Sequence, residues 1–224
     1  MTFPPELAVV PSIAGSFFRP AVRSAVTPAT LARFAPPTLG RVGLDGFLAL
    51  GALVGTVGWA GTALLTARPG LVGDPVLVSV VLWAVLVAVM VGVGVFGTPD
   101  AVRFSRPMLV WGPVNALATL ATLLALFGPL PEATPLVAWG LAGLVGYAAS
   151  AYWTAGVQRR TYAVAAFFEA QTLAAVTPLA PAHTYLLLGV CHAVPLAVVA
   201  TTRHRLAPYA VGVAWLVVLL AGLV

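Results

Sequence analysis

Three polar side chains lie near the centres of long apolar runs in this sequence: Glu169, His192 and Asn115. A carboxyl group and an imidazole can each take up and release a proton, and an amide both donates and accepts hydrogen bonds. Polar groups inside the hydrocarbon of a membrane are costly, so such residues are the first candidates for function. We expect a polar pocket near the membrane midplane, with Glu169 and His192 as a proton-exchanging pair beside Asn115.

The position of Glu169 limits what its carboxyl group can do. It lies nine residues beyond Arg160, which is about 13 Å along a helix axis, and its short side chain cannot extend to the membrane surface. The carboxyl group must therefore pair with a partner, face water or carry a proton. Helical spacing puts three further polar side chains on or near the same face: Gln158, Tyr162 and Thr172.

A structural role is the alternative for these residues, because Asn, Gln and Thr side chains commonly hydrogen-bond one membrane helix to another. This interpretation is favoured for Asn115, whereas a functional role is favoured for Glu169. For His192 both interpretations stay open.

The composition excludes a soluble protein. Of 224 residues, 61% are apolar, and only 11 basic and 6 acidic residues are charged, whereas roughly 25% of an ordinary soluble domain is charged. A single cysteine, Cys191, excludes an internal disulfide and a Cys-rich metal site. The net charge of +5 is small and comes from arginines in short loops. We therefore expect the lipid bilayer as a partner and no nucleic acid.

The charged residues separate the sequence into apolar runs that each fit one membrane-crossing helix of about 20 residues. Between 161 and 202 the only charge is Glu169, and Pro178 and Pro181 divide that stretch into two helices. We expect an all-α transmembrane bundle over 44–224, with seven spans at about 46–67, 75–97, 107–128, 134–156, 161–178, 182–201 and 206–224.

The arginines predict the orientation, because cytoplasmic loops collect positive charge. With seven spans and a cytoplasmic N-terminus, ten arginines lie inside and only Arg68 lies outside. If the fifth segment did not cross, Arg203 and Arg205 would move outside, and the division would be eight to three. We therefore expect a multi-pass protein of the cytoplasmic membrane with its C-terminus outside.

The first 43 residues form a separate proline-rich segment on the cytoplasmic side. Arg23 and Arg33 are mixed with apolar residues there, as in a helix that lies in the membrane interface. The prolines leave little unbroken helix. A lead-in that only sets orientation is therefore the favoured interpretation, and an interfacial helix is the alternative.

A weak internal similarity relates the first and fourth spans. Residues 53–67 and 141–155 are identical at eight of 15 positions. Two further pairs are chemically alike at matching positions: Trp59 with Tyr147 and Thr62 with Ser150. Small residues spaced four apart in both segments predict that these spans pack inside the bundle. Because the two spans run in opposite directions, a duplication of spans one to three as four to six would be an inverted repeat, as in many transporters.

Several aromatic residues fall near the predicted ends of the spans. Trp111, Trp153 and Tyr162 are near cytoplasmic ends, and Trp139 and Tyr185 are near outer ends. Such positions are typical of rings that anchor a protein in the membrane interface, and we expect that role for them.

We expect neither a metal nor another cofactor. A haem held by two histidines needs them on facing helices, whereas His183 and His192 lie on one predicted helix, half a turn out of phase. The sequence has no hydrolase, P-loop or intramembrane-protease motif. An enzyme is therefore not the favoured function.

Basic side chains gather at the cytoplasmic ends of the later spans: Arg159, Arg160, Arg203 and Arg205, with His204 among them. Such a cluster can bind the phosphate of a lipid, as a lipid-acting enzyme would require. Charges that only set orientation are the favoured interpretation.

The leading functional expectation is the passage of a small solute or ion, coupled to protons through Glu169. Two alternatives stay open. One is a non-catalytic subunit or assembly factor that binds other membrane proteins or a second copy of itself, and the other is a lipid-acting enzyme. A transporter needs a water-filled cavity that reaches Glu169, whereas a subunit needs none.

Overall fold

The computed structural model describes residues 41–175, 179–202 and 204–223. The elements are α2 (Leu44–Ala67), η1 (Pro69–Leu71), α3 (Pro75–Gly92) continued by the π-helical turn η2 (Val93–Gly97), α4 (Asp100–Arg103), α5 (Arg106–Phe127), α6 (Thr134–Trp153), α7 (Gly156–Ala174), α8 (Pro181–Thr201) and α9 (Ala207–Ala221). These described residues contain no strand, which confirms the all-helical prediction.

Local sequence explains where the helices begin. Proline occupies the first turn of α3, α5, α6, α8 and α9, where its fixed φ suits a helix and its missing N–H costs nothing. Asp74 caps α3 by accepting a hydrogen bond from the Leu77 N–H at 2.9 Å. α7 begins at Gly156, five residues before the predicted start at 161, and Gly156 has φ +59°, a conformation that glycine adopts without strain.

Five described segments are long and apolar enough to cross a membrane: α2, α3 with η2, α5, α6 and α8. This supports the prediction of an integral membrane protein. α7 is less apolar because it carries Arg159, Arg160 and Glu169. α9 has 15 residues, so it extends about 22 Å, less than the roughly 30 Å of membrane hydrocarbon.

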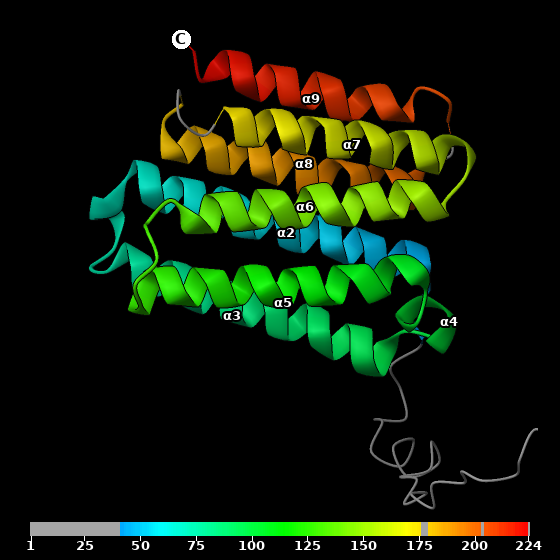
Figure 1. Cartoon of the computed structure of the whole chain (residues 1–224), viewed down its shortest axis with the longest axis horizontal. Helices are drawn as coiled ribbons and strands as arrows, with labels where there is room; N and C mark the ends of the chain where they lie inside the picture. Colours follow the sequence, from blue (N-terminus) through cyan, green and yellow to red (C-terminus); the bar gives the residue numbers. More distant parts are fainter. Residues whose placement is uncertain (1–40, 176–178, 203, 224) are drawn as a thin grey trace, which may run out of the picture. The chain divides into compact units, whose positions relative to one another are not determined.

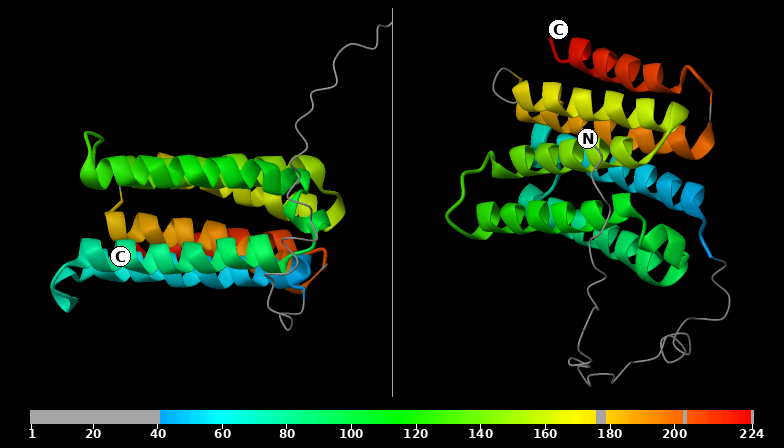
Figure 2. Two further views of the ribbon diagram at one scale, coloured as in Figure 1. Left: turned by 90° about the horizontal axis from the view of Figure 1, so that it is seen from below. Right: turned by 45° about the vertical axis from the view of Figure 1, so that its right-hand side comes forward.

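The long helices lie side by side and alternate in direction (Figure 1). α5, α6 and α7 form one layer, and α3, α2 and α8 form a second layer behind it. The left view of Figure 2 shows the two layers apart. α9 packs against both α7 and α8. Packing therefore does not follow chain order, because α2 lies beside α8, which is distant in sequence.

A tryptophan from α3 closes the contact between α3 and α2. The Trp83 ring lies over Gly58, where an added Cβ would be only 2.5 Å from the ring. The indole N–H of Trp83 donates a hydrogen bond to the Thr62 hydroxyl at 2.9 Å. The missing side chain at Gly58 is thus what lets the ring approach α2.

The same contact occurs between α5 and α6. The Trp111 ring lies over Gly146, where an added Cβ would again be 2.5 Å away, and its N–H donates to the Ser150 hydroxyl at 3.1 Å. α2 and α6 are also among the most buried of the candidate spans. This confirms the prediction that the first and fourth spans pack inside the bundle.

The expected anchoring role is wrong for most of the aromatic residues. Trp139 donates a hydrogen bond across the bundle to the Thr122 hydroxyl at 3.1 Å, and Trp111 and Tyr185 also pack against other helices. Tyr162 is buried in the core, whereas Trp153 is exposed. For Trp111 the room inside comes from Gly146 of the facing helix, which the distance of a ring from a span end does not reveal.

The expected proline-rich segment 1–43 lies outside the described residues, except for positions 41–43. Arg203 of the basic cluster also lies outside them. The described part of the expected transmembrane domain begins with α2.

Replacing either glycine beneath a tryptophan ring should destabilise the bundle. Gly58→Ala and Gly146→Ala each push a Cβ into an indole ring, and such overpacking costs about 1–3 kcal/mol. The measurement is the thermal unfolding of the purified protein in detergent. Gly112→Ala is the matched control, because no atom of a facing helix lies within 4 Å of the place that its Cβ would take. Equal melting temperatures for all three variants would contradict this packing.

Candidate functional site

Glu169 and His192 meet in the interior of the bundle. Glu169 lies in α7 and His192 in α8, and the carboxylate Oε1 is 3.0 Å from the imidazole Nδ1. The Glu169 side chain is fully buried and that of His192 is 12% exposed. The structure thus brings together two of the three residues proposed for the polar pocket, from helices that are consecutive along the chain.

The imidazole Nδ1 faces two acceptors at once. Besides the carboxylate of Glu169, the backbone carbonyl of Leu188 lies 2.9 Å away. A proton on Nδ1 points better toward that carbonyl, so neither Glu169 oxygen has a well-directed hydrogen bond, and Nε2 of His192 has no partner among the described residues. Buried polar atoms normally have partners. A site with spare acceptors can hold a proton on either side chain.

Gly143 of α6 makes the space in which the pair meets. An added Cβ at this position would lie 2.5 Å from Oε1 of Glu169 and 2.9 Å from Cε1 of His192. From α2, Gly55 lies close enough that a Cβ would touch the His192 Cβ at 3.7 Å. Two glycines therefore border the pair.

Two aromatic rings lie on either side of His192 along the bundle axis. The Trp59 ring centre is 5.5 Å from the imidazole and packs beside Gly189, one turn earlier in α8. The Tyr147 ring is 6.2 Å away, one turn beyond Gly143 in α6. Because α6 and α8 run in the same direction, these rings cover opposite ends of the pair.

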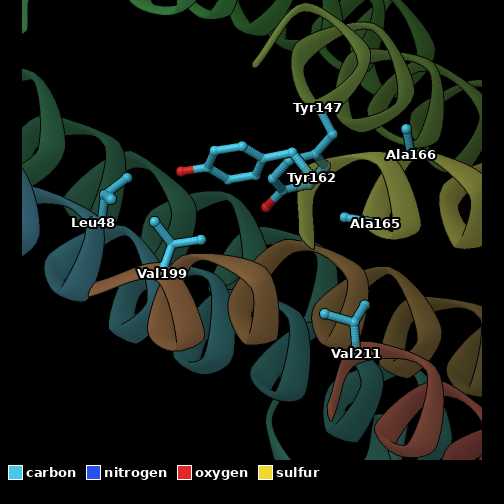
Figure 3. Packing of buried hydrophobic residues seen from close by; sticks show 7 residues of the cluster. All are labelled: Leu48, Tyr147, Tyr162, Ala165, Ala166, Val199 and Val211. Carbon is cyan, nitrogen blue, oxygen red and sulfur yellow. The ribbon is translucent and has the colours of Figure 1, made fainter. Parts of the chain in front are cut away.

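Tyr147 also binds α8 directly. Its hydroxyl donates a hydrogen bond to the backbone carbonyl of His192 at 2.7 Å, and its ring stacks on Tyr162 at 5.8 Å. Figure 3 shows both tyrosines together with Leu48 and Val199 of the facing helices. This part of the bundle is filled by side chains.

A cavity lies on the other side of Trp59. Its volume is about 560 Å³, and it is lined by residues of α2, α3, α5 and α6 together with Tyr185 of α8. Trp59 lines this cavity and also contacts the His192 ring. Neither Glu169 nor His192 lines it. Glu169 therefore faces a seam between helices, with Trp59 between the pair and the cavity, so the cavity expected of a transporter does not extend to Glu169 in this conformation.

Asn115, the third proposed residue, is not joined to the pair. The contacts of Trp111 with Ser150 and of Thr122 with Trp139 fix the antiparallel register of α5 and α6. That register puts Asn115 level with Gly146, one turn from Gly143. Its side chain makes no hydrogen bond among the described residues, and its Oδ1 is buried.

The described members of the basic cluster are separate from the pair. Arg159 donates from Nε to the carbonyls of Thr154 at 2.9 Å and Ala151 at 3.2 Å, so it caps the end of α6. Arg160 and Arg205 are exposed. In the part of the chain that the structure describes, no group of three or more His, Cys, Asp or Glu residues is arranged to hold a metal.

Periodicity identifies the buried face of α7 correctly, since Tyr162, Glu169 and Thr172 are all buried. It does not identify the residues that surround the pair from other helices: Gly55, Gly143, Trp59 and Tyr147. The signal that relates them is the internal similarity. When residues 53–67 are aligned with 141–155, Gly55 matches Gly143 and Trp59 matches Tyr147. All four lie around His192.

Comparison with protein-family models, with curated proteins and with solved structures finds no match for this chain.

Removing the Tyr147 hydroxyl should loosen the contact between α6 and α8. Tyr147→Phe keeps the ring but loses the hydrogen bond to the His192 carbonyl, and a bond of this kind contributes about 1 kcal/mol. We expect a lower free energy of unfolding in denaturant titration. Tyr152→Phe, at an exposed tyrosine of the same helix, should leave it unchanged. A loss of equal size in both variants would contradict the assignment.

Proposed function

We propose that this protein passes a small solute or ion across the cytoplasmic membrane and that Glu169 and His192 carry the coupled proton. The observation that carries the proposal is the 3.0 Å contact between these two side chains deep in the bundle. An ionisable pair in the interior of a membrane protein is costly, and such residues usually mark a functional site. Simple helix association needs only uncharged hydrogen-bonding groups.

The proposed topology has seven crossings, with the N-terminal segment 1–43 in the cytoplasm and the C-terminus outside. The ten-to-one division of the arginines supports it. The lower hydropathy of α7 is compatible with a crossing, because two of its charges are at its first turns and the third, Glu169, is paired in the interior. The short α9 packs against α7 and α8 in the same alternating order.

Transport through the pair requires access from each side in turn, because Trp59 and Tyr147 cover its two ends in the conformation described. We propose that the helices around His192 shift so that one ring moves away while the other stays in place. A proton taken up from one side would then rest on the pair and leave toward the other side. Alternating access of this kind is typical of proteins built from inverted halves.

A packing contact that recurs in both layers supports this scheme. Trp83 on Gly58 matches Trp111 on Gly146, so α2 corresponds to α6, and α3 corresponds to α5. A duplication of spans one to three as four to six would instead relate α3 to α7. The relation that we propose pairs α2 with α6 and α3 with α5 by their packing. It is therefore different from the duplication of spans one to three that the sequence suggested.

A non-catalytic subunit or assembly factor is the second candidate function. α3 has no buried residue although it is the most apolar of the candidate spans. Such a surface fits another membrane helix as well as it fits lipid. The lipid-acting enzyme is less favoured, because the guanidinium of Arg159 already caps α6.

Thiol labelling tests the seven crossings. In a Cys191→Ala background, His204→Cys should react only from the cytoplasmic side and Leu223→Cys only from the outside. Cells and inverted vesicles are treated with a membrane-impermeant maleimide. If α7 did not cross, His204→Cys would react from the outside, and the proposed topology would be wrong. Gly70→Cys, in the loop after α2, is the control for the outer side.

Replacing Glu169 should stop proton movement. Wild-type protein in liposomes that enclose a pH-sensitive dye is given an inward proton gradient, with valinomycin and potassium to balance charge. Because a glutamine cannot take up a proton at neutral pH, Glu169→Gln should lower the flux at least tenfold, to the level of protein-free liposomes.

The control for this measurement is Glu132→Gln, at an exposed position between α5 and α6, which should keep the wild-type flux. Melting temperatures of both variants show whether the fold is retained. A folded Glu169→Gln variant with wild-type flux would contradict the proposed function, and so would a wild-type protein without flux.

A further inference from the structure

The cavity beside Trp59 has the size of a ligand-binding site. Its volume of about 560 Å³ lies within the range of roughly 300–1,000 Å³ that is usual for small-molecule sites. Three of the six tryptophans, Trp59, Trp83 and Trp139, form part of its wall together with Tyr185. None of the described lining residues is charged.

The polar groups of the wall are mostly satisfied within the protein. The indole N–H groups of Trp83 and Trp139 donate to the hydroxyls of Thr62 and Thr122. These hydroxyls in turn donate to carbonyls of their own helices. The wall therefore presents mainly ring faces and aliphatic groups, which suit an uncharged and largely apolar molecule.

Two hydroxyls remain for orienting a ligand. Ser79 of α3 and Tyr185 of α8 both line the cavity, and neither hydroxyl has a hydrogen-bond partner among the described residues. A ligand with one hydroxyl or carbonyl group can bond to either of them. A phosphate headgroup would find no cationic side chain in the described lining, so the same wall disfavours a phospholipid.

The position of the cavity indicates how a ligand enters. α3 and α5 border it, and both lie at the outside of the bundle, since α3 has no buried residue and α5 only Ala118. In the left view of Figure 2 these helices stand apart, with α8 visible between them. In a bilayer, this side of the bundle faces hydrocarbon, from which an apolar molecule reaches the cavity without crossing water.

We propose that the cavity binds an uncharged, mainly apolar molecule with a single hydrogen-bonding group, taken up from the bilayer between α3 and α5. The identification of this molecule as the transported solute rests on the proposed function. The binding of such a molecule in the cavity does not rest on it. Trp59 contacts both the cavity and the His192 ring. A bound ligand therefore contacts the residue that separates it from the proton pair.

Quenching of tryptophan fluorescence tests the binding directly. The probe is 4-bromo-4′-hydroxybiphenyl, an uncharged ring compound with one hydroxyl, whose bromine quenches nearby indoles. It is titrated into the purified protein in nanodiscs of unbrominated phospholipid. We expect a saturable component of quenching above the linear background of membrane partition.

Two alanines of α3 provide matched variants. Ala84 lines the cavity, whereas Ala88, one turn further along α3, is exposed and does not line it. Ala84→Phe fills the cavity and should weaken the saturable binding at least tenfold, while Ala88→Phe should bind as the wild type does. Unsaturable quenching in the wild type, or equal binding by both variants, would overturn the proposal.

Nanodiscs of dibrominated phosphatidylcholine separate the ligand classes. If Ala84→Phe relieves quenching by this lipid while the biphenyl shows no saturable binding, the occupant is a phospholipid chain and the proposed ligand class is wrong. Glu169→Gln should bind the biphenyl like the wild type. Intact binding without proton flux in the wild type would overturn the proposed function alone, and intact flux without saturable binding would overturn this inference alone.

Discussion

The contact between Glu169 and His192 is the constraint on which the interior of this protein depends. A carboxyl group in an apolar interior needs a partner that also lies there, and α7 packs with its acidic face toward α8. The two side chains occupy space directly against α6, and α6 can pack there only because Gly143 has no side chain. One buried acid therefore determines the orientation of α7 and restricts a residue on a neighbouring helix.

Close approach of aromatic rings to glycines holds the remaining helices together. In lipid there is no hydrophobic force between helices, so association depends on packing and hydrogen bonds. Trp83 and Trp111 provide both, because each ring fills the space above a glycine and each N–H bonds to a hydroxyl of the same facing helix. The two layers each use this contact once, between α2 and α3 in one layer and between α5 and α6 in the other.

The cavity and the Glu169–His192 pair are separate places that share one residue. The cavity has an uncharged lining, whereas the pair holds the titratable groups and is closed off by packed side chains. Trp59 belongs to the wall of the first and to the surroundings of the second. Under the proposed function, this division keeps the titratable groups of the pair away from the ligand.

The sequence by itself determined the long helices and the face of α7 that carries Glu169. Most of the long helices match an apolar run between charges, because the thickness of the hydrocarbon dictates the length of such runs. α7 carries three charges of its own, and there the period of 3.6 residues identified the buried face. Only the tertiary structure decided that His192 rather than Asn115 meets Glu169, that the aromatic rings turn inward, and that a cavity lies beyond Trp59. Periodicity shows which side chains share a face of one helix. Which faces meet depends on packing among all the helices, where a missing Cβ at Gly143 or Gly146 counts as much as any side chain.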